Sequence, residues 1–303
     1  MRIAITASTG LIGGALSQSL SADGFEVLRL VRRPSSGRGE IQWDPTAPSG
    51  ALSPGALDGI DAVVHLSGAP LANGRWTPAR KQELRASRID STRALVTAML
   101  AAAQRPPVLI AGSAIGWYGD TGNRPVDETA PAGSGFLATL VRDWEAATSP
   151  AREAGIRVAN LRSGIVLSSR GGMLPRLLLP FRLGLGGKFG TGTQYLSWIT
   201  LSDHIRAVRF LLERRDLSGP FNLTAPEPAT NAELTRALAA TLHRPAFLQV
   251  PAGALRLALG EVSTELLGSC RALPARLQQA GFSFRHPTIG PALAAAAADK
   301  PAR

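Results

Sequence analysis

The chain has 303 residues, of which 45% are hydrophobic, and carries a formal net charge of +11. That length is long for one domain and short for two large ones, and the hydrophobic content suffices for a sizeable core. No apolar run reaches the roughly 18 residues of a membrane helix, and the chain starts directly with a strand rather than a signal peptide. The single cysteine, Cys270, excludes an internal disulfide, and the four histidines lack metal-ligand spacing. We therefore expect a cytoplasmic protein without a metal site.

The positive charge by itself does not indicate nucleic-acid binding. The basic residues are almost all arginines, and they are spread along the chain without a basic tail or a basic–aromatic repeat. Two explanations remain. Arginine replaces lysine across an ordinary surface, or some arginines line a cleft that holds phosphate groups, which suit the guanidinium fork.

The first recognisable unit is a strand, a glycine turn and a helix. Ile3–Ile5 reads as a buried strand, and after the turn apolar residues recur at helical spacing until Asp23-Gly24. Gly10 and Gly13 allow a tight turn and close packing of the helix on the strand, so that free N–H groups face a pyrophosphate. Ala7 occupies the position of the usual first glycine. The unit predicts dinucleotide binding; the alternative is a turn with no ligand.

The end of the second strand, Glu26–Val31, indicates which dinucleotide is bound. An acidic residue there would hold the ribose 2′-OH of NAD, but this chain has Arg32-Arg33. Arginine suits a 2′-phosphate, so the sequence favours NADP over NAD. The alternative is a solvated pair of surface arginines.

Further apolar runs extend the pattern to a doubly wound parallel sheet. Asp61–Leu66 reads as a strand buried on both faces, and Leu66 and Ser67 begin a small-residue loop at its carboxyl end, where such sheets bind ligands. Strands are also predicted at Val108–Ala111 and Arg157–Leu161, with Ser113 just past the end of the former.

The pattern changes after residue 165, which suggests two regions. We expect an α/β, Rossmann-type domain over residues 1–165 and a smaller, mainly helical substrate-side region over 166–303, with strands near 196–224 returning to or beside the sheet.

Several longer segments carry a family resemblance. They are Thr6–Gly13, Ser87-Arg88, Gly112–Asp120, Leu161–Leu167, Pro180–Gly187, Trp198–Asp203 and Arg271–Leu277. In these segments and their order the chain resembles the extended short-chain dehydrogenase/reductases. It is most similar to their NAD(P)-dependent epimerase/dehydratase-like subgroup, which ends in a C-terminal domain of unknown function, here at about residues 248–296.

The resemblance implies an NADP-binding sheet, with the substrate held between the sheet and the C-terminal region, and a homodimer as a family-level expectation. It also implies cofactor contacts, three of which the residues had indicated already: Gly10, Arg32 and the loop at Leu66 and Ser67. The resemblance alone adds Leu11, Ile12, Glu83 and Arg88.

Catalysis is where the chain departs from the wider superfamily. That superfamily pairs a serine with Tyr-x-x-x-Lys on a helix, where the tyrosine transfers a proton and the lysine lowers its pKa. The corresponding helix here has Phe136 and Leu140, and neither tyrosine of the chain is followed four residues later by lysine. Ser113 and Tyr118 are the nearest replacements, although Tyr118 reads equally well as a packing residue.

The residues expected on the substrate side combine aromatic faces and cations: Arg75, Trp76, Lys81, Arg162 and Trp198. Such groups suit a sugar nucleotide or another phosphorylated small molecule. The alternative is that Trp198 packs in the core and Arg162 pairs with a carboxylate.

Two functional hypotheses follow. One is an NADP-dependent oxidoreductase or epimerase-like enzyme acting on a small polar substrate, possibly a sugar nucleotide or a carbonyl compound. The other is an NADPH-binding sensor or partner-binding protein with little catalysis.

Overall fold

The computed structural model of the protein describes residues 1–47 and 51–299. Its centre is a seven-stranded sheet in the order β12-β7-β5-β4-β1-β2-β3, in which all neighbouring strands are parallel. The strands are β1 (Arg2–Thr6), β2 (Glu26–Val31), β3 (Glu40–Gln42), β4 (Ala62–His65), β5 (Val108–Ala114), β7 (Arg157–Ser163) and β12 (Gly219–Leu223). This arrangement confirms the doubly wound parallel sheet.

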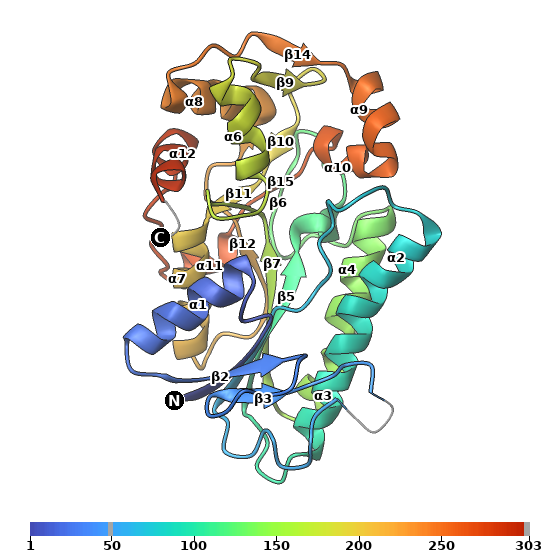
Figure 1. Ribbon diagram of the computed structural model, residues 1–303, viewed down its shortest axis with the longest axis vertical. Helices are drawn as coiled ribbons and strands as arrows, with labels where there is room; N and C mark the ends of the chain where they lie inside the picture. Colours follow the sequence, from blue (N-terminus) through green and yellow to red (C-terminus); the bar gives the residue numbers. More distant parts are fainter. Residues whose placement is uncertain (48–50, 300–303) are drawn as a thin grey trace.

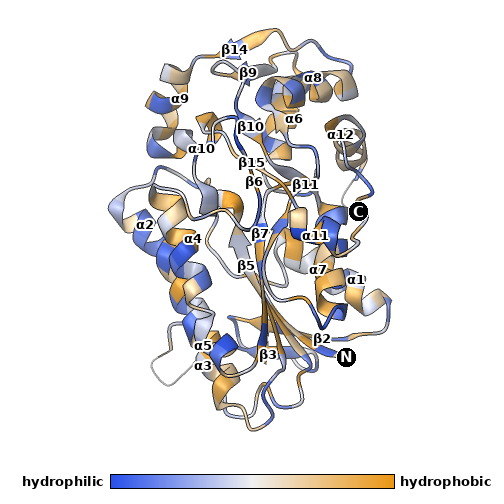
Figure 2. Ribbon diagram, turned by 180° about the vertical axis from the view of Figure 1, so that it is seen from behind, coloured by the Kyte–Doolittle hydropathy of each residue, from blue (hydrophilic) through white to orange (hydrophobic). Residues whose placement is uncertain are grey.

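Helices cover both faces of the sheet (Figure 1). One face carries α1 (Leu11–Ala22), α7 (Leu201–Glu213) and the short α11 (Ala275–Gln279). The other carries α2 (Pro78–Arg85), the π-helical turn η1 (Ala86–Asp90), α3 (Ser91–Ala101) and α4 (Phe136–Ala146), with α5 (Ser149–Glu153) beside α3 in Figure 2. A 3₁₀ turn, η2 (Ile115–Tyr118), follows β5.

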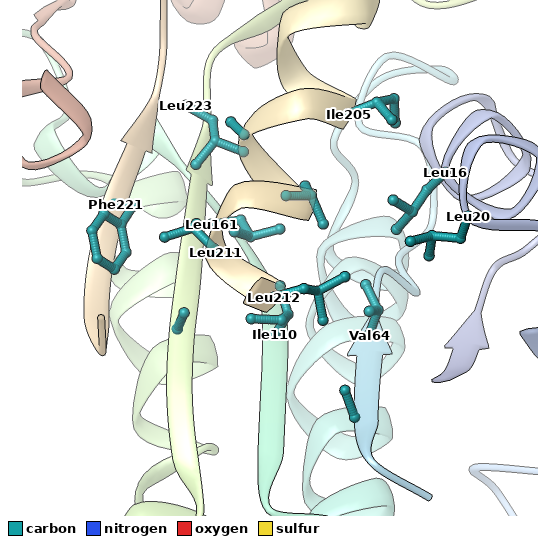
Figure 3. Packing of buried hydrophobic residues seen from close by; sticks show 14 of the residues in the cluster. Leu16, Leu20, Val64, Ile110, Leu161, Ile205, Leu211, Leu212, Phe221 and Leu223 are labelled. Atoms are coloured by element: carbon teal, nitrogen blue, oxygen red, sulfur yellow. The ribbon is translucent and has the colours of Figure 1, made fainter. Parts of the chain in front are cut away.

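The sheet is apolar on both faces because each face is covered by helices. Figure 3 shows one of the two layers, in which Leu16 and Leu20 of α1 lie on the side of Val64, and Leu211 of α7 lies beside Leu161 of the sheet. A second buried cluster fills the opposite face. Figure 2 shows the apolar strands between helices whose residues are of mixed hydropathy. A fully buried aliphatic side chain contributes about 1.5–3 kcal/mol, so these two layers hold the Rossmann half together.

The rest of the chain forms a second lobe at the carboxyl ends of β5 and β7 (Figure 1). Its helices are α6 (Leu174–Arg182), α8 (Asn231–Leu242), α9 (Ala252–Leu259), the 3₁₀ turn η3 (Gly260–Val262), α10 (Ser263–Leu267) and α12 (Ile289–Ala298). Four two-stranded ladders link it together: β6 (Pro125–Val126) with β15 (Arg271–Ala272), β8 (Ile165–Leu167) with β11 (Trp198–Thr200), β9 (Gly187–Phe189) with β14 (Leu248–Val250), and β10 (Tyr195–Leu196) with β13 (Ala229–Thr230). The lobe therefore borders the sheet edge where ligands bind in this fold.

Local signals fix where several helices begin. Thr77 caps α2 by accepting a hydrogen bond from the Arg80 backbone N–H at 3.2 Å, and Pro78 follows at the first helical position. Thr230 and Glu233 form a reciprocal capping box at the start of α8. Within the described residues, no helix combines the length and apolarity needed to cross a bilayer.

Candidate functional site

The glycine turn between β1 and α1 presents backbone donors at an open position. Gly10 precedes α1 with extended backbone angles (φ −77°, ψ 174°), is exposed, and has no side chain to cap the helix. The N–H groups of Leu11 and Ile12 lie in the first turn, which has no intrahelical acceptors. A Cβ at Gly13 would lie 2.2 Å from the Ala7 carbonyl oxygen, so only glycine permits this packing. Free backbone donors at the positive end of a helix dipole are the groups that suit a phosphate anion.

The two arginines after β2 differ in what they contact. Arg33 donates two hydrogen bonds to the Glu40 carboxylate, at 2.8 and 2.7 Å, and lowers the pKa of Glu40 to about 2. Arg32 is exposed and makes no hydrogen bond or ion pair within residues 1–47 and 51–299. Of the two residues directly after β2, Arg32 is therefore the one whose guanidinium has no partner in the described chain.

Buried hydrogen bonds hold the start of the loop that follows β4. The Leu66 N–H donates to Thr6 Oγ1 at 2.9 Å, and the Thr6 hydroxyl also contacts His65 Nδ1 at 3.0 Å. His65 is fully buried, and burial lowers its pKa to about 4, so it is the packed histidine expected from the sequence. Leu66 and Ser67, which are half-buried, follow at the carboxyl edge of the sheet.

Arg88 lies beneath the same loop as a buried cation. Its guanidinium donates to the Leu84 and Ala69 carbonyls at 3.3 and 3.0 Å, and a Cβ at Gly68 would lie 3.1 Å from its Cζ. Burial lowers the pKa of Arg88 to about 10, with repulsion from Arg80 adding to the effect. No carboxylate of the described chain forms an ion pair with Arg88, so an anion at this loop would be stabilised.

Glu83, by contrast, lies on the exposed face of α2. Its carboxylate pairs with Arg80 at 2.5 Å. Its place beside the cofactor remains a prediction from the resemblance.

A cavity of about 520 Å³ opens between the carboxyl ends of β5 and β7 and the second lobe. Its wall is mainly apolar and includes the start of α4, the turn after β5 and the segment around α10. The lining residues used below are Trp76, Ala114, Ile115, Asp120, Phe136, Ser163, Ile165, Tyr195, Glu261, Glu265 and Cys270. Its size is typical of small-molecule sites.

Ser113 does not lie past the end of its strand, as the sequence suggested, but inside it. β5 continues to Ala114, because it pairs with β7 as far as Ala114 opposite Ser163. Ser113 is 5% exposed and donates a hydrogen bond to the Glu145 carboxylate at 2.6 Å. The next residue, Ala114, lines the cavity instead.

Tyr118 belongs to the same buried network. Arg162 pairs with Glu145 at 2.8 Å and donates to the Tyr118 hydroxyl at 3.1 Å, while that hydroxyl donates to Asn222 at 2.7 Å. Burial raises the pKa of Tyr118 to about 12. Neither Ser113 nor Tyr118 lines the cavity, and both hydroxyl groups donate their proton within the network. The structure therefore favours the packing alternative for Tyr118 and the carboxylate pairing for Arg162.

Of the five residues expected to face a substrate, Trp76 alone lines the cavity. Arg75 donates to the carbonyls of Leu257 and Ala258 in α9, and Lys81 pairs with Glu261 at 2.6 Å. Trp198 is fully buried in the core of the second lobe, so the packing alternative holds for its position.

Phe136 and Leu140, where the resemblance predicts the tyrosine and lysine of the wider superfamily, are apolar. Phe136 lines the cavity at the start of α4, and Leu140, one turn later, is buried. Sequence reasoning missed Glu265, a carboxylate on the cavity wall. Its only sequence signal is its spacing four residues after Glu261, which is typical of a solvated helix face.

Comparison with known proteins gives a consistent assignment. The sequence model of the NAD dependent epimerase/dehydratase family matches residues 3–224, and that of a domain of unknown function, DUF1731, matches residues 250–296. The epimerase family protein Mb2239 of Mycobacterium bovis is 49% identical over 292 residues, covering 96% of each chain.

Two solved structures extend the likeness. The crystal structure of human epimerase family protein SDR39U1 with NADPH aligns with a TM-score of 0.88 and 35% identity, over 98% of this chain and 99% of that one. A nucleoside-diphosphate sugar epimerase from Corynebacterium glutamicum aligns with a TM-score of 0.80 and 37% identity, over 98% of this chain and 58% of that longer one. The chain therefore belongs to the NAD dependent epimerase/dehydratase family, with a C-terminal DUF1731 domain.

Proposed function

We propose that this protein binds NADPH in preference to NADH and acts as an oxidoreductase or epimerase-like enzyme on a small carbonyl compound or alcohol. The observation that carries the proposal is the contrast between Arg33, which is held by Glu40, and Arg32, which is exposed beside the glycine turn. The relative SDR39U1 was solved with NADPH, which supports the same cofactor here.

The residues present fit a bound dinucleotide phosphate. The N–H groups of Leu11 and Ile12 would hold the pyrophosphate, Arg32 the 2′-phosphate, and the loop at Ser67 would face the bound dinucleotide above the Arg88 guanidinium. When bound, the cofactor supplies or accepts a hydride. The cavity at the ends of β5 and β7 would then orient the substrate and exclude water from it.

A charge reversal at Arg32 tests the preference. A charge-assisted hydrogen bond contributes about 1.5–3 kcal/mol, so Arg32→Asp should weaken NADPH binding about 10- to 100-fold and leave NADH binding nearly unchanged. The matched control is Arg152→Asp. Arg152 is exposed on α5, which leads into the amino end of β7, whereas Arg32 follows the carboxyl end of β2. Nicotinamide fluorescence measures both affinities. An unchanged ratio of NADPH to NADH affinity in Arg32→Asp would refute the proposal.

One observation favours a second candidate, an NADPH sensor with little catalysis. Phe136 and Leu140 carry no proton-transferring group, and the hydroxyls of Ser113 and Tyr118 are held in the buried network. Steady NADPH consumption with any carbonyl compound would exclude the sensor. Tight NADPH binding without turnover across a broad panel would favour it.

A further inference from the structure

The cavity wall has a chemical character that bears on the substrate. Its lining residues are mostly aliphatic, aromatic or glycine, and its ionisable members within the described chain are three carboxylic acids, a tyrosine and a thiol. No lysine or arginine of the described chain lines it. Sites that bind a diphosphate normally present cations, most often the bidentate arginine fork. The described residues that line this wall supply no such cation.

The cations near the cavity already have partners. Lys81 is paired with Glu261 and lies 4.9 Å from the centre of the Phe136 ring. Arg75 is bonded to α9 carbonyls. Arg271 stacks on the Tyr195 ring at 4.8 Å and donates to the Asn123 carbonyl at 3.3 Å. Recruiting any of these side chains to a phosphate would break an existing contact.

The three acids of the wall differ in what they contact. Asp120 accepts backbone hydrogen bonds from Gly122 and Ser269, at 2.9 and 3.3 Å, and Glu261 is held by Lys81. Glu265 makes no hydrogen bond or ion pair within residues 1–47 and 51–299. It is therefore the acid that remains available to a ligand in this cavity.

The surroundings of Glu265 favour its neutral form. Glu265 is exposed as a residue, but the protein around its carboxyl group raises the pKa of that group by desolvation, and repulsion from Glu261 adds to the rise. Cys270, which lines the same cavity, has a pKa raised to about 12 by burial and stays a neutral thiol below that pH. A protonated carboxyl group can donate a hydrogen bond to a carbonyl oxygen, whereas an ionised one cannot.

We propose that this cavity takes an uncharged, mainly apolar carbonyl compound or the corresponding alcohol, with its oxygen bound to Glu265, and that it excludes nucleotide sugars. The proposal rests on the proposed function, since it names the substrate class of that site. It separates this chain from relatives described as nucleoside-diphosphate sugar epimerases, such as the Corynebacterium glutamicum protein.

Ligand binding to the NADPH complex tests the substrate class. NADPH binding is measured first by nicotinamide fluorescence, so that a failure there counts against the proposed function and not against the substrate class. Calorimetry then compares UDP-glucose with a series of phenylalkyl ketones and cyclic ketones. We expect at least one ketone to bind at least about tenfold more tightly than UDP-glucose. Binding of UDP-glucose in competition with a ketone, or no binding by any ketone, would overturn the proposal.

The pH dependence of ketone binding tests the role of Glu265. If the protonated acid donates to the ketone, affinity should fall by about tenfold or more between pH 6 and pH 9. Glu265→Gln should remove this slope, because an amide donates at every pH. The other acids of the same wall are Glu261, which is paired with Lys81, and Asp120.

The matched control is Glu261→Gln, which changes the neighbouring acid of the same wall. This variant should keep the slope and move its midpoint to lower pH, because repulsion on Glu265 is removed. A flat profile in the unmodified protein, or an affinity that rises with pH, would overturn the assignment of Glu265.

Discussion

Two corners of the carboxyl edge of the sheet invite comparison. At the end of β1, the glycine turn offers open backbone N–H groups and no charged side chain of its own. At the ends of β5 and β7, Ser113, Tyr118, Glu145 and Arg162 form a buried network in which each of these side chains is hydrogen-bonded. The backbone donors of the first corner lack partners, whereas the side chains of the second are hydrogen-bonded to one another.

The difference shows why residue type alone misleads at a sheet edge. Serine, tyrosine and arginine are residues of catalysis, yet here they satisfy one another away from the cavity. The turn has no catalytic residue type, but its donors remain available to an anion. Hydrogen-bond partners, and not residue type alone, therefore show which polar groups at this sheet edge remain open to a ligand.

Removing a charge from the buried network should have the largest effect on the free energy of unfolding. Arg162→Met leaves Glu145 buried without its cation and should lower the free energy of unfolding by about 3–5 kcal/mol. Urea denaturation followed by tryptophan fluorescence measures the loss. The double variant Arg162→Met with Glu145→Leu should recover part of it, because an apolar replacement of a buried pair is often tolerated.

A surface pair supplies the control for that comparison. Arg85 and Asp143 pair at 2.8 Å, but their side chains are 41% and 26% exposed. Arg85→Met should therefore cost about 0–1 kcal/mol. A loss below about 1 kcal/mol in Arg162→Met as well would mean that the network does not hold the ends of β5 and β7 together.

The sequence predicted those elements whose signals are local. The strand at Glu26–Val31 has the bounds expected from its apolar run, and the glycine turn lies where its spacing indicated. The end of β5 was misjudged, because the small residues Gly112, Ser113 and Ala114 carry no strand signal of their own. Their strand conformation depends on pairing with β7, which is distant in the sequence.

The candidate site was predictable in part, for the same reason. The cofactor corner is built from consecutive residues, whereas the cavity wall joins α4, η2 and α10, which only the tertiary fold brings together. The sequence left Trp198 between core packing and a substrate contact, because a buried tryptophan and a ligand-facing one have the same sequence signal, and the structure buries it. Glu265 gave no local signal that it faces a cavity.

A substitution that disturbs the glycine turn should have an intermediate effect on the free energy of unfolding. In Gly13→Ala, the new Cβ would lie 2.2 Å from the Ala7 carbonyl oxygen, so the helix must move from the strand, at a cost of about 1–3 kcal/mol. The same movement should weaken NADPH binding by at least about tenfold, because the N–H donors are displaced.

The neighbouring glycine supplies the control. In Gly14→Ala, the new Cβ would lie 3.5 Å from the Ser8 carbonyl oxygen, an ordinary contact. That variant should keep NADPH affinity and gain up to about 1 kcal/mol from the better helix propensity of alanine. Equal NADPH affinities in the two variants would mean that close packing of this helix does not position the donors.

The smallest effect is expected from relieving backbone strain at Ala7 in the glycine turn. Ala7 has a φ of +51°, a left-handed conformation that costs a residue with a Cβ about 1–2 kcal/mol. Ala7→Gly removes that strain but adds freedom to the unfolded chain, so we expect a net gain of about 0.5–1 kcal/mol in the free energy of unfolding. His243 at the end of α8 has the same φ, and His243→Gly should give a similar gain. NADPH titrations then separate the two positions. If the conformation of Ala7 positions the N–H donors of the turn, Ala7→Gly should lower NADPH affinity and His243→Gly should not. Equal affinity in the two variants would mean that the strain at Ala7 does not contribute to NADPH binding.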